Sequence, residues 1–432
     1  MNEQDAEKNN QAGDSPAVVS RRKFLAAGAT VVGAELVGLT VARSVFPPAS
    51  AAAESSGRSQ ADAPTVPEDP TKVPGTPPSP YGARSTFERE TRLAGSSHSL
   101  TPHQDLDGII TPSSLHFERH HNGVPLIDPA RHRLLIHGLV ERPLIFTMED
   151  LRRFPSMSRL AFIECSGNSA GEWKAPSGHT AQNTHGLLST SEWTGVPLKI
   201  LLQEVGAKRE ATWMLAEGSD AAAMTRSIPL AEALEEALLC YAQNGEALRP
   251  EQGYPLRLLL PGWEGNTSIK WLRRLKLGAA PFMTREETSH YTDLMPNGTA
   301  RQFTLVMDAK SLITSPSGGQ QIQPGFIEIR GLAWSGRGRV TSLEVSTDGG
   351  RSWTPATLQE PVLPKCATAF RFGWRWAGEE AILQSRCTDE SGYVQPTRQA
   401  LLAVRGSNSY YHYNAIQSWN VARDGKVGNV HL

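Results

Sequence analysis

The chain has 432 residues, of which 20% are charged and 39% hydrophobic, and its formal net charge is -1. This length exceeds what one hydrophobic core ordinarily serves, so we expect two domains with extensions. The balanced charge lacks the excess of positive groups that nucleic-acid binding needs, and we expect no nucleic-acid partner.

Residues 1–53 have the pattern of an export signal. The stretch 20–25 (Ser-Arg-Arg-Lys-Phe-Leu) opens an apolar run to Val45, and the small residues 49–53 suit a signal peptidase. This pattern predicts a twin-arginine signal peptide, a periplasmic location and, since that pathway exports folded proteins commonly built around a cofactor, a redox enzyme. A membrane anchor is the alternative, but glycines and charged residues interrupt the run, so we expect no stable membrane span.

Residues 54–95 are rich in Pro, Ser, Gly and Thr, which predicts a disordered linker. Residues 96–290 then mix two kinds of pattern. Short apolar runs at 134–139 and 256–262 indicate strands, whereas 232–241 has apolar residues at helical spacing before a stop signal at Asn244-Gly245. We therefore predict an α+β fold for this domain.

Residues 291–405 have the character of an all-β domain. The stretches 326–334, 340–347 and 381–387 follow one another as short strands, and Asp348-Gly349-Gly350 has the composition of a hairpin turn. Several short strands with regular turns predict an immunoglobulin-like sandwich.

The C-terminal tail, residues 406–432, concentrates aromatic and imidazole side chains. We interpret it as a partner-docking segment, with loose terminal packing as the alternative. The side chains concerned are Tyr410, Tyr411, His412, Tyr413, Trp419 and His431.

The four cysteines are Cys165, Cys240, Cys366 and Cys387, and no pair has CxxC spacing. Iron–sulfur, zinc-ribbon and haem-attachment sites therefore have no support. Spacing does not decide whether Cys366 pairs with Cys387.

Cys165 stands in the most informative motif, residues 162–173 (Phe-Ile-Glu-Cys-Ser-Gly-Asn-Ser-Ala-Gly-Glu-Trp). A cysteine at the end of a short apolar strand and before Ser-Gly-Asn has its sulfur in a turn that a ligand can approach. Taken alone, a buried structural cysteine is the commoner interpretation. Two further stretches change that balance: 115–125 (Leu-His-Phe-Glu-Arg-His-His-Asn-Gly-Val-Pro) and 253–272, which contains Leu-Pro-Gly-Trp-Glu-Gly-Asn-Thr-Ser-Ile-Lys-Trp.

In this order the three stretches resemble the sulfite oxidase family of molybdopterin enzymes, in which one cysteine is the protein ligand of molybdenum. The resemblance implies molybdenum and molybdopterin as cofactors, Cys165 as the metal ligand, and a homodimer formed through the β domain. The cofactor-binding residues that it implies are Phe117, Arg119, His120, His121, Cys165, Gln252, Arg257, Ser268, Ile269 and Lys270.

The chemistry explains why these residue types are needed. Molybdenum cycles by two electrons and passes an oxo group to a sulfur lone pair, so the protein must supply one soft ligand, a cradle for the cofactor and an open face. A cation near the oxo group stabilises an anionic substrate, and Arg119 is our catalytic candidate beside Cys165. The resemblance also implies a pocket arginine from the β domain, for which Arg371 and Arg375 are candidates.

The sequence departs from sulfite oxidases at the pocket. Ser169 and Ala170 stand where those enzymes have an arginine, and Met224 stands where they have a tyrosine shortly before the Ser-Ile-Pro-Leu stretch 227–230. A thioether cannot replace a phenol in hydrogen bonding, which makes free sulfite a less favoured substrate. Gln252 replaces a histidine but can still donate to the cofactor.

Together with the aromatic tail, these departures resemble the sulfane dehydrogenases within the family, the molybdenum subunits of thiosulfate oxidation. That resemblance implies sulfane sulfur bound to a sulfur carrier protein as substrate and a c-type dihaem cytochrome as electron acceptor. The alternatives are a periplasmic sulfite dehydrogenase, a reductase of oxidised methionine in proteins, which generally lacks the β domain, and a non-catalytic exported binding module.

Overall fold

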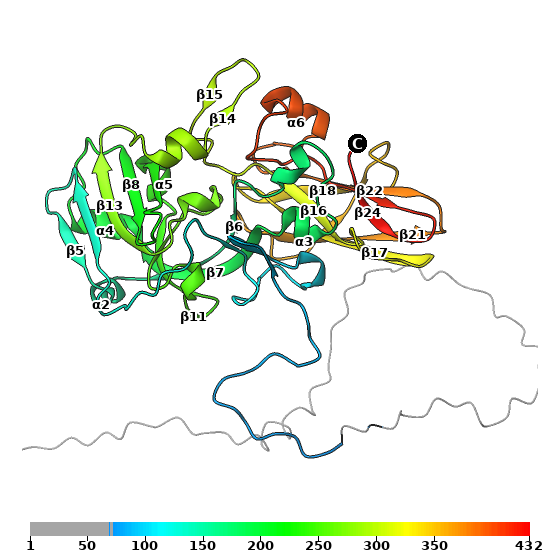
Figure 1. Ribbon diagram of the computed structural model, residues 1–432, viewed down its shortest axis with the longest axis horizontal. Helices are drawn as coiled ribbons and strands as arrows, with labels where there is room; N and C mark the ends of the chain where they lie inside the picture. The colour runs from blue at the N-terminus through cyan, green and yellow to red at the C-terminus, as the bar shows by residue number, and fades with distance from the viewer. Residues whose placement is uncertain (1–68, 70–71) are drawn as a thin grey trace, which may run out of the picture. The chain divides into compact units, whose positions relative to one another are not determined.

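The computed structural model describes residue 69 and residues 72–432 (Figure 1). The chain divides into two units, Met1–Gly82 and Ala83–Leu432, and all helices and strands named below lie in the second. The export signal and residues 54–68, 70 and 71 of the linker lie outside the described residues, so both the signal and the disorder of the linker stay predictions. None of the described helices is long and apolar enough to cross a membrane.

Three sheets build the first part of the second unit. A small antiparallel sheet has the order β1-β2-β3, a five-stranded sheet the order β5-β4-β13-β8-β9, and another the order β11-β10-β7-β6 with β12 paired to β10. The strands are β1 (Leu93–Ala94), β2 (His98–Leu100), β3 (Glu118–Arg119), β4 (Leu134–Gly138), β5 (Leu144–Phe146), β6 (Met157–Glu164), β7 (Leu188–Pro197), β8 (Trp213–Gly218), β9 (Thr225–Pro229), β10 (Leu238–Gln243), β11 (Glu246–Ala247), β12 (Arg257–Leu259) and β13 (Leu272–Gly278).

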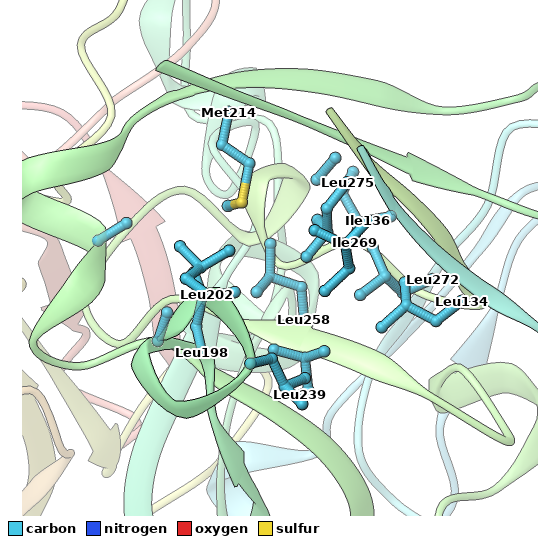
Figure 2. Packing of buried hydrophobic residues seen from close by; sticks show 14 of the residues in the cluster. Leu134, Ile136, Leu198, Leu202, Met214, Leu239, Leu258, Ile269, Leu272 and Leu275 are labelled. Carbon is cyan, nitrogen blue, oxygen red and sulfur yellow. The ribbon is translucent and has the colours of Figure 1, made fainter. Parts of the chain in front are cut away.

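The two five-stranded sheets share one apolar core, in which leucine side chains from both meet (Figure 2). Leu134 and Leu275 come from one sheet, Leu239 and Leu258 from the other, and all four are fully buried. Each such side chain contributes about 1.5–3 kcal/mol when it leaves water. The same core therefore holds β12, whose Arg257 faces the site, against the rest of the domain.

Helices are few and short in the described chain, and the longest, α6, has eight residues. They are α2 (Met148–Arg153), α3 (Ala181–His185), α4 (Leu198–Glu204), α5 (Leu230–Leu234) and α6 (Arg398–Arg405), with single turns η2 (His103–Asp105), η3 (Ala170–Trp173), η4 (Pro250–Gln252), η5 (Gly265–Thr267) and η6 (Glu286–His290). Helix α2 begins in a capping box in which Thr147 and Asp150 satisfy each other's backbone N–H groups.

Two antiparallel sheets form the second part, with orders β16-β17-β21-β20 and β19-β18-β22-β23-β24, and the short pair β14-β15 precedes them. Their apolar faces share one core, which also takes in Phe162 and Leu188 from the first part. The strands are β14 (Asp293–Leu294), β15 (Ala300–Arg301), β16 (Lys310–Ser315), β17 (Gly325–Trp334), β18 (Val340–Ser346), β19 (Thr354–Pro355), β20 (Thr357–Leu358), β21 (Thr368–Trp376), β22 (Ala381–Asp389), β23 (Ser418–Val421) and β24 (Val427–Val430).

The predicted strands at 134–139, 256–262, 326–334, 340–347 and 381–387 are confirmed as β4, β12, β17, β18 and β22. The predicted helix at 232–241 is wrong in its second half, because the chain leaves α5 and forms β10 between β7 and β12. Asn244 and Gly245 have positive φ and connect β10 to β11, so they make a hairpin turn rather than a helix end. The chain is mostly sheet, and the immunoglobulin-like order of the second part stays a prediction.

The C-terminal tail is packed onto the rest of the unit. His412, Tyr413 and Trp419 are buried, whereas Tyr410 is 60% exposed. Strands β23 and β24 lie within this tail and pair with β22, so they complete a sheet (Figure 1). The loose-packing alternative therefore does not describe these residues. All four cysteines are free, and Cys366 is not bridged to Cys387.

A buried ion pair joins the two parts next to Cys165. Glu164, the last residue of β6, accepts hydrogen bonds from Lys310 Nζ at 3.1 Å and from Trp334 Nε1 at 2.7 Å. Lys310 belongs to β16 and Trp334 to β17, and all three side chains are almost fully buried. Burial lowers the pKa of Lys310, and the carboxylate of Glu164 opposes this shift. The pair thus fixes the end of β6 to the β domain.

We predict that Lys310→Ala lowers the free energy of unfolding by about 3–5 kcal/mol, because it leaves the Glu164 carboxylate buried without its cation. Lys426→Ala is the control, since Lys426 pairs with Asp424 at 3.1 Å on the surface, and exposed pairs contribute about 0–1 kcal/mol. Urea unfolding followed by tryptophan fluorescence measures both. Equal stabilities of the two variants would contradict this account.

Candidate active site

The turn after β6 places Cys165 at the edge of a cavity. Its backbone N–H donates to Leu187 O at 3.0 Å and its carbonyl accepts from Asn168 N at 2.8 Å, which closes the turn. The Asn168 side chain donates to Glu164 at 2.9 Å and accepts from Leu187 N at 3.1 Å. The thiol is therefore held on both sides of the turn. Burial raises the pKa of Cys165, so a nearby cation such as a metal ion is required to keep it a thiolate.

The cavity is open to solvent, and its empty space, counted with the solvent at its mouth, is about 670 Å³. All ten residues predicted to bind the cofactor line it: Phe117, Arg119, His120, His121, Cys165, Gln252, Arg257, Ser268, Ile269 and Lys270. They come from stretches separated by up to about 150 residues, and the sheets bring them together at one place.

Three cationic side chains line this cavity: Arg119, Arg257 and Lys270. Burial lowers the pKa of Arg257 to about 10 and, with the charge of Arg257, holds the pKa of Lys270 well below its ordinary value. Lys270 Nζ donates to the carbonyls of Arg119 and Glu251 at 3.1 Å and contacts His120 Nδ1 at 2.7 Å. Cations buried in this way favour an anionic ligand, because its charge offsets the loss of hydration.

Polar atoms without partners show where a ligand fits. Arg257 Nε and Asn266 Oδ1 are buried and have no hydrogen-bond partner, although Arg257 Nη1 donates to Gln252 at 3.2 Å. Buried polar atoms are normally paired, so these two favour a polar group in the cavity. A phosphorylated pterin supplies an anion and acceptors for Arg257 and N–H donors for Asn266 Oδ1, so these residues fit molybdopterin.

One glycine allows the backbone to come close to this wall. Gly253 has φ +109°, and a methyl group there would lie 3.1 Å from Lys270 Cα and 3.3 Å from Arg257 Cβ. Only glycine adopts this conformation without strain. Gln252, just before it, donates to Phe117 O at 2.8 Å and so ties the stretch 253–272 to the stretch 115–125.

Other cavity residues carried no assignment from the sequence. Asp220, Asn266, Trp271 and Tyr291 also line it, and Met224 faces the same space. Asn266 and Trp271 lie inside the stretch 253–272, so the motif that identified their neighbours as cofactor residues could also have identified them. Tyr291 follows the turn η6 in a segment without a motif, and no sequence signal pointed to it.

The predicted arginine of the β domain lies elsewhere. Arg371 is on the outward face of β21, where it pairs with Glu328 at 2.6 Å, and Arg375 is exposed on the same face. A single chain therefore does not bring Arg371 to the cavity around Cys165. Ser169, at the position where sulfite oxidases have an arginine, instead accepts a hydrogen bond from Lys310 at 3.0 Å.

The C-terminal tail covers the Cys165 turn from outside. The backbone N–H of His412 donates to Ser166 O at 2.9 Å, and its ring Nε2 contacts Glu264 Oε1 at 2.5 Å. A methyl group on Gly167 would lie 3.5 Å from the Tyr410 ring and 3.9 Å from Cys165 Sγ. The tail is therefore part of the wall that encloses the sulfur.

Comparisons with known proteins agree with this arrangement. Residues 121–286 match the family model of the oxidoreductase molybdopterin binding domain, and residues 301–419 match that of the Mo-co oxidoreductase dimerisation domain. The sulfite oxidase of Gallus gallus is 30% identical over an alignment of 370 residues, which covers 78% of this chain and 77% of that protein. The chain belongs to the sulfite oxidase family.

Two further proteins resemble the chain. A nitrate reductase [NADH] of Ulva prolifera is 31% identical over 376 residues, covering 74% of this chain and 42% of that longer protein. The crystal structure of the sulfane dehydrogenase SoxCD from Paracoccus pantotrophus matches with a TM-score of 0.78 and 48% identity, covering 82% of this chain and 94% of that one. Membership of the family implies the molybdenum cofactor, which the cavity residues fit.

We predict that Arg257→Met lowers the affinity for the molybdenum cofactor by about tenfold to a hundredfold, since a lost charged hydrogen bond costs about 1.5–3 kcal/mol. Arg273→Met is the control, because Arg273 is half-exposed on β13 and pairs with Glu217. Molybdenum and pterin content per chain after extended dialysis measures the difference. Equal retention by both variants would show that Arg257 does not hold the cofactor.

Proposed function

We propose that this chain is the molybdenum subunit of a periplasmic sulfane dehydrogenase. It oxidises sulfane sulfur bound to a sulfur carrier protein during thiosulfate oxidation and passes the electrons to a c-type dihaem cytochrome. The likeness to SoxCD at 48% identity supports this proposal. The observation that carries the chemistry is the half-buried thiol of Cys165 at a cavity lined by Arg119, Arg257 and Lys270.

Different residues of the chain bind the cofactor and the substrate in this proposal. When bound, the molybdenum cofactor supplies two-electron transfer of an oxygen atom to a sulfur lone pair. Cys165 holds the metal, Arg257 and Lys270 hold the anionic part of the cofactor, and Arg119 faces the anionic sulfur of the substrate.

The reaction balances with water and an electron acceptor. One oxygen atom from water bonds to the terminal sulfur, two protons are released, and two electrons pass to the cytochrome. Repeating this step carries the sulfur to higher oxidation states, while the sulfur–sulfur bond to the carrier stays intact.

The identities of Met224 and Ser169 support the proposal that the substrate is bound to a carrier protein. Both stand where sulfite oxidases place groups for free sulfite, and the structure directs Ser169 to Lys310 rather than into the cavity. A substrate held by its carrier depends less on an anion clamp, because the carrier protein supplies binding energy of its own.

The partners and the location belong to the same proposal. Residues 301–419 match a dimerisation domain, which supports a homodimer through the β domain. The twin-arginine pattern of residues 1–53 supports export to the periplasm.

A periplasmic sulfite dehydrogenase is the second candidate, and the 30% identity to a sulfite oxidase favours it. The two candidates differ in the preferred substrate. We expect kcat/KM for a carrier-bound persulfide to exceed that for sulfite, measured with one cytochrome acceptor. A preference for sulfite would support the second candidate instead.

We predict that Cys165→Ser abolishes turnover and removes most of the bound molybdenum while the fold remains, because a hydroxyl is a poor ligand for a soft metal site. Cys366→Ala is the control, since Cys366 is buried in the β domain and does not line the cavity. Elemental analysis and activity on carrier-bound sulfur measure the effect, and circular dichroism checks the fold. Turnover retained by Cys165→Ser would contradict the metal assignment.

A further inference from the structure

The cavity around Cys165 is lined by a tyrosine, Tyr291, in addition to Met224. Met224 stands where sulfite oxidases have a tyrosine, so position 224 has no hydrogen-bond donor. The structure brings Tyr291 into the same cavity as Met224 and Cys165. The two positions are far apart in the chain, and a network of buried polar groups brings them together.

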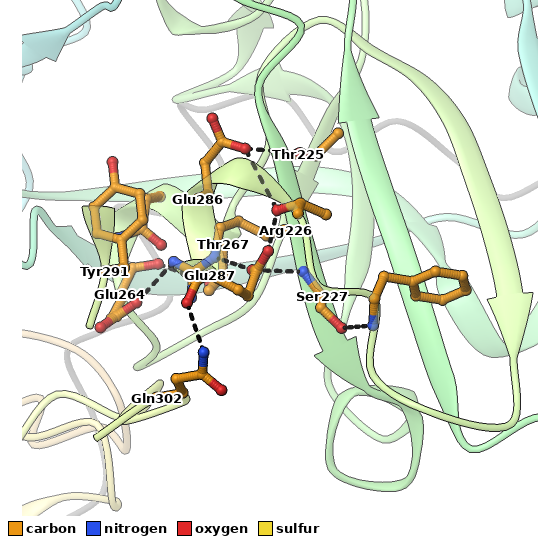
Figure 3. Close-up of polar contacts among 12 residues, drawn as sticks. Thr225, Arg226, Ser227, Glu264, Thr267, Glu286, Glu287, Tyr291 and Gln302 are labelled. Atoms are coloured by element: carbon orange, nitrogen blue, oxygen red, sulfur yellow. Dashed lines mark hydrogen bonds and ion pairs between the residues drawn. The ribbon is translucent and has the colours of Figure 1, made fainter. Parts of the chain in front are cut away.

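Strand β9, which begins directly after Met224, anchors the turn that carries Tyr291 (Figure 3). Glu287 Oε1 accepts hydrogen bonds from Arg226 Nε and from the Ser227 backbone, both at 2.8 Å. Thr225 Oγ1 donates to Glu286 at 2.8 Å. Three consecutive residues of β9 therefore fix η6, and they also fix the distance between position 224 and the phenol.

The turn itself has an unusual geometry. Tyr291 N–H donates to Glu286 O at 2.9 Å, which closes a single turn of π-helix. Such turns are rare and occur frequently at functional sites. The Arg226 guanidinium lies 4.8 Å from the centre of the Tyr291 ring, and the Tyr411 ring packs against it at 5.3 Å. The ring is thus held on two sides, and its orientation is set by packing.

The hydroxyl of Tyr291 is available to a ligand. Among its described contacts, the polar one is His121 Nε2 at 3.3 Å, longer than a strong hydrogen bond. Burial raises the pKa of Tyr291, so the phenol keeps its proton. Burial also lowers the pKa of His121, which leaves a neutral ring beside it. The phenol is therefore a neutral O–H donor beside the charged Arg119.

We propose that Tyr291 donates a hydrogen bond to the oxygen that the substrate sulfur carries in the cavity, and so takes over the role of the phenol missing at position 224. This inference rests on the proposed function. It assigns Tyr291 as a substrate-contacting residue, with Glu286 and Glu287 as the residues that position it.

The test compares Tyr291→Phe with Tyr411→Phe in the holoenzyme. Both changes remove one hydroxyl from adjoining rings, but Tyr411 does not line the cavity. We expect Tyr291→Phe to lower kcat/KM for carrier-bound sulfur by about a hundredfold, as for the loss of one donor to a developing oxyanion. It should also weaken the binding of sulfate, an unreactive oxyanion measured by titration calorimetry, while molybdenum content and unfolding midpoint stay unchanged.

A restoring variant separates contact from structure. Met224→Tyr combined with Tyr291→Phe places a phenol back at position 224, and we expect it to recover sulfate binding and part of kcat/KM. Unchanged kinetics and sulfate binding in Tyr291→Phe, or an equal loss in Tyr411→Phe, would overturn the inference. Either result in an active, molybdenum-loaded wild type leaves the proposed function standing, whereas a wild type without molybdenum or turnover refutes the proposed function itself.

Discussion

The site depends on one constraint: a single sulfur atom must be held still between two domains. The chain meets it with two buried carboxylates on either side of Cys165. Glu164 binds Lys310 and Trp334 of the β domain, and Glu264 binds Arg226 at 2.8 Å and His412 of the tail. Buried ion pairs fix geometry rather than add much stability, because desolvation cancels much of the attraction. Residues of both domains and of the tail therefore fix the position of the Cys165 turn together.

The cavity contains buried cationic side chains, Arg257 and Lys270, that pair with no carboxylate among the described residues. Its buried cations are held away from water, as the lowered pKa of Arg257 indicates. An anionic cofactor restores the charge balance, so its binding is coupled to the stability of the wall around it. The same cavity also contains groups without a formal charge, such as Met224 and Tyr291, which we propose lie near the substrate.

Much of the site could be predicted from the sequence because its residues lie in three continuous stretches at the ends of strands. The ten cofactor residues needed only motif order to be grouped, and the structure places all of them on one cavity. The place of Tyr291 in the cavity could not be predicted from the sequence, because tertiary hydrogen bonds and not a sequence motif position it. Arg371 illustrates another limit: side chains alternate along a strand, and sequence alone does not decide which face of β21 is outward. The apolar run at 238–240 suited a helix or a buried strand, and pairing with β7 and β12 decided it.

Strands β23 and β24, with the tail segment that precedes them, have a consequence for biosynthesis. The ribosome produces these residues after the three stretches that carry the cofactor residues, yet His412 completes the enclosure of the Cys165 turn. The contacts that cover the Cys165 turn from the outside can therefore form only after translation has passed His412. If the first 53 residues are the export signal that we propose, a chain truncated before His412 would be exported with the Cys165 turn uncovered.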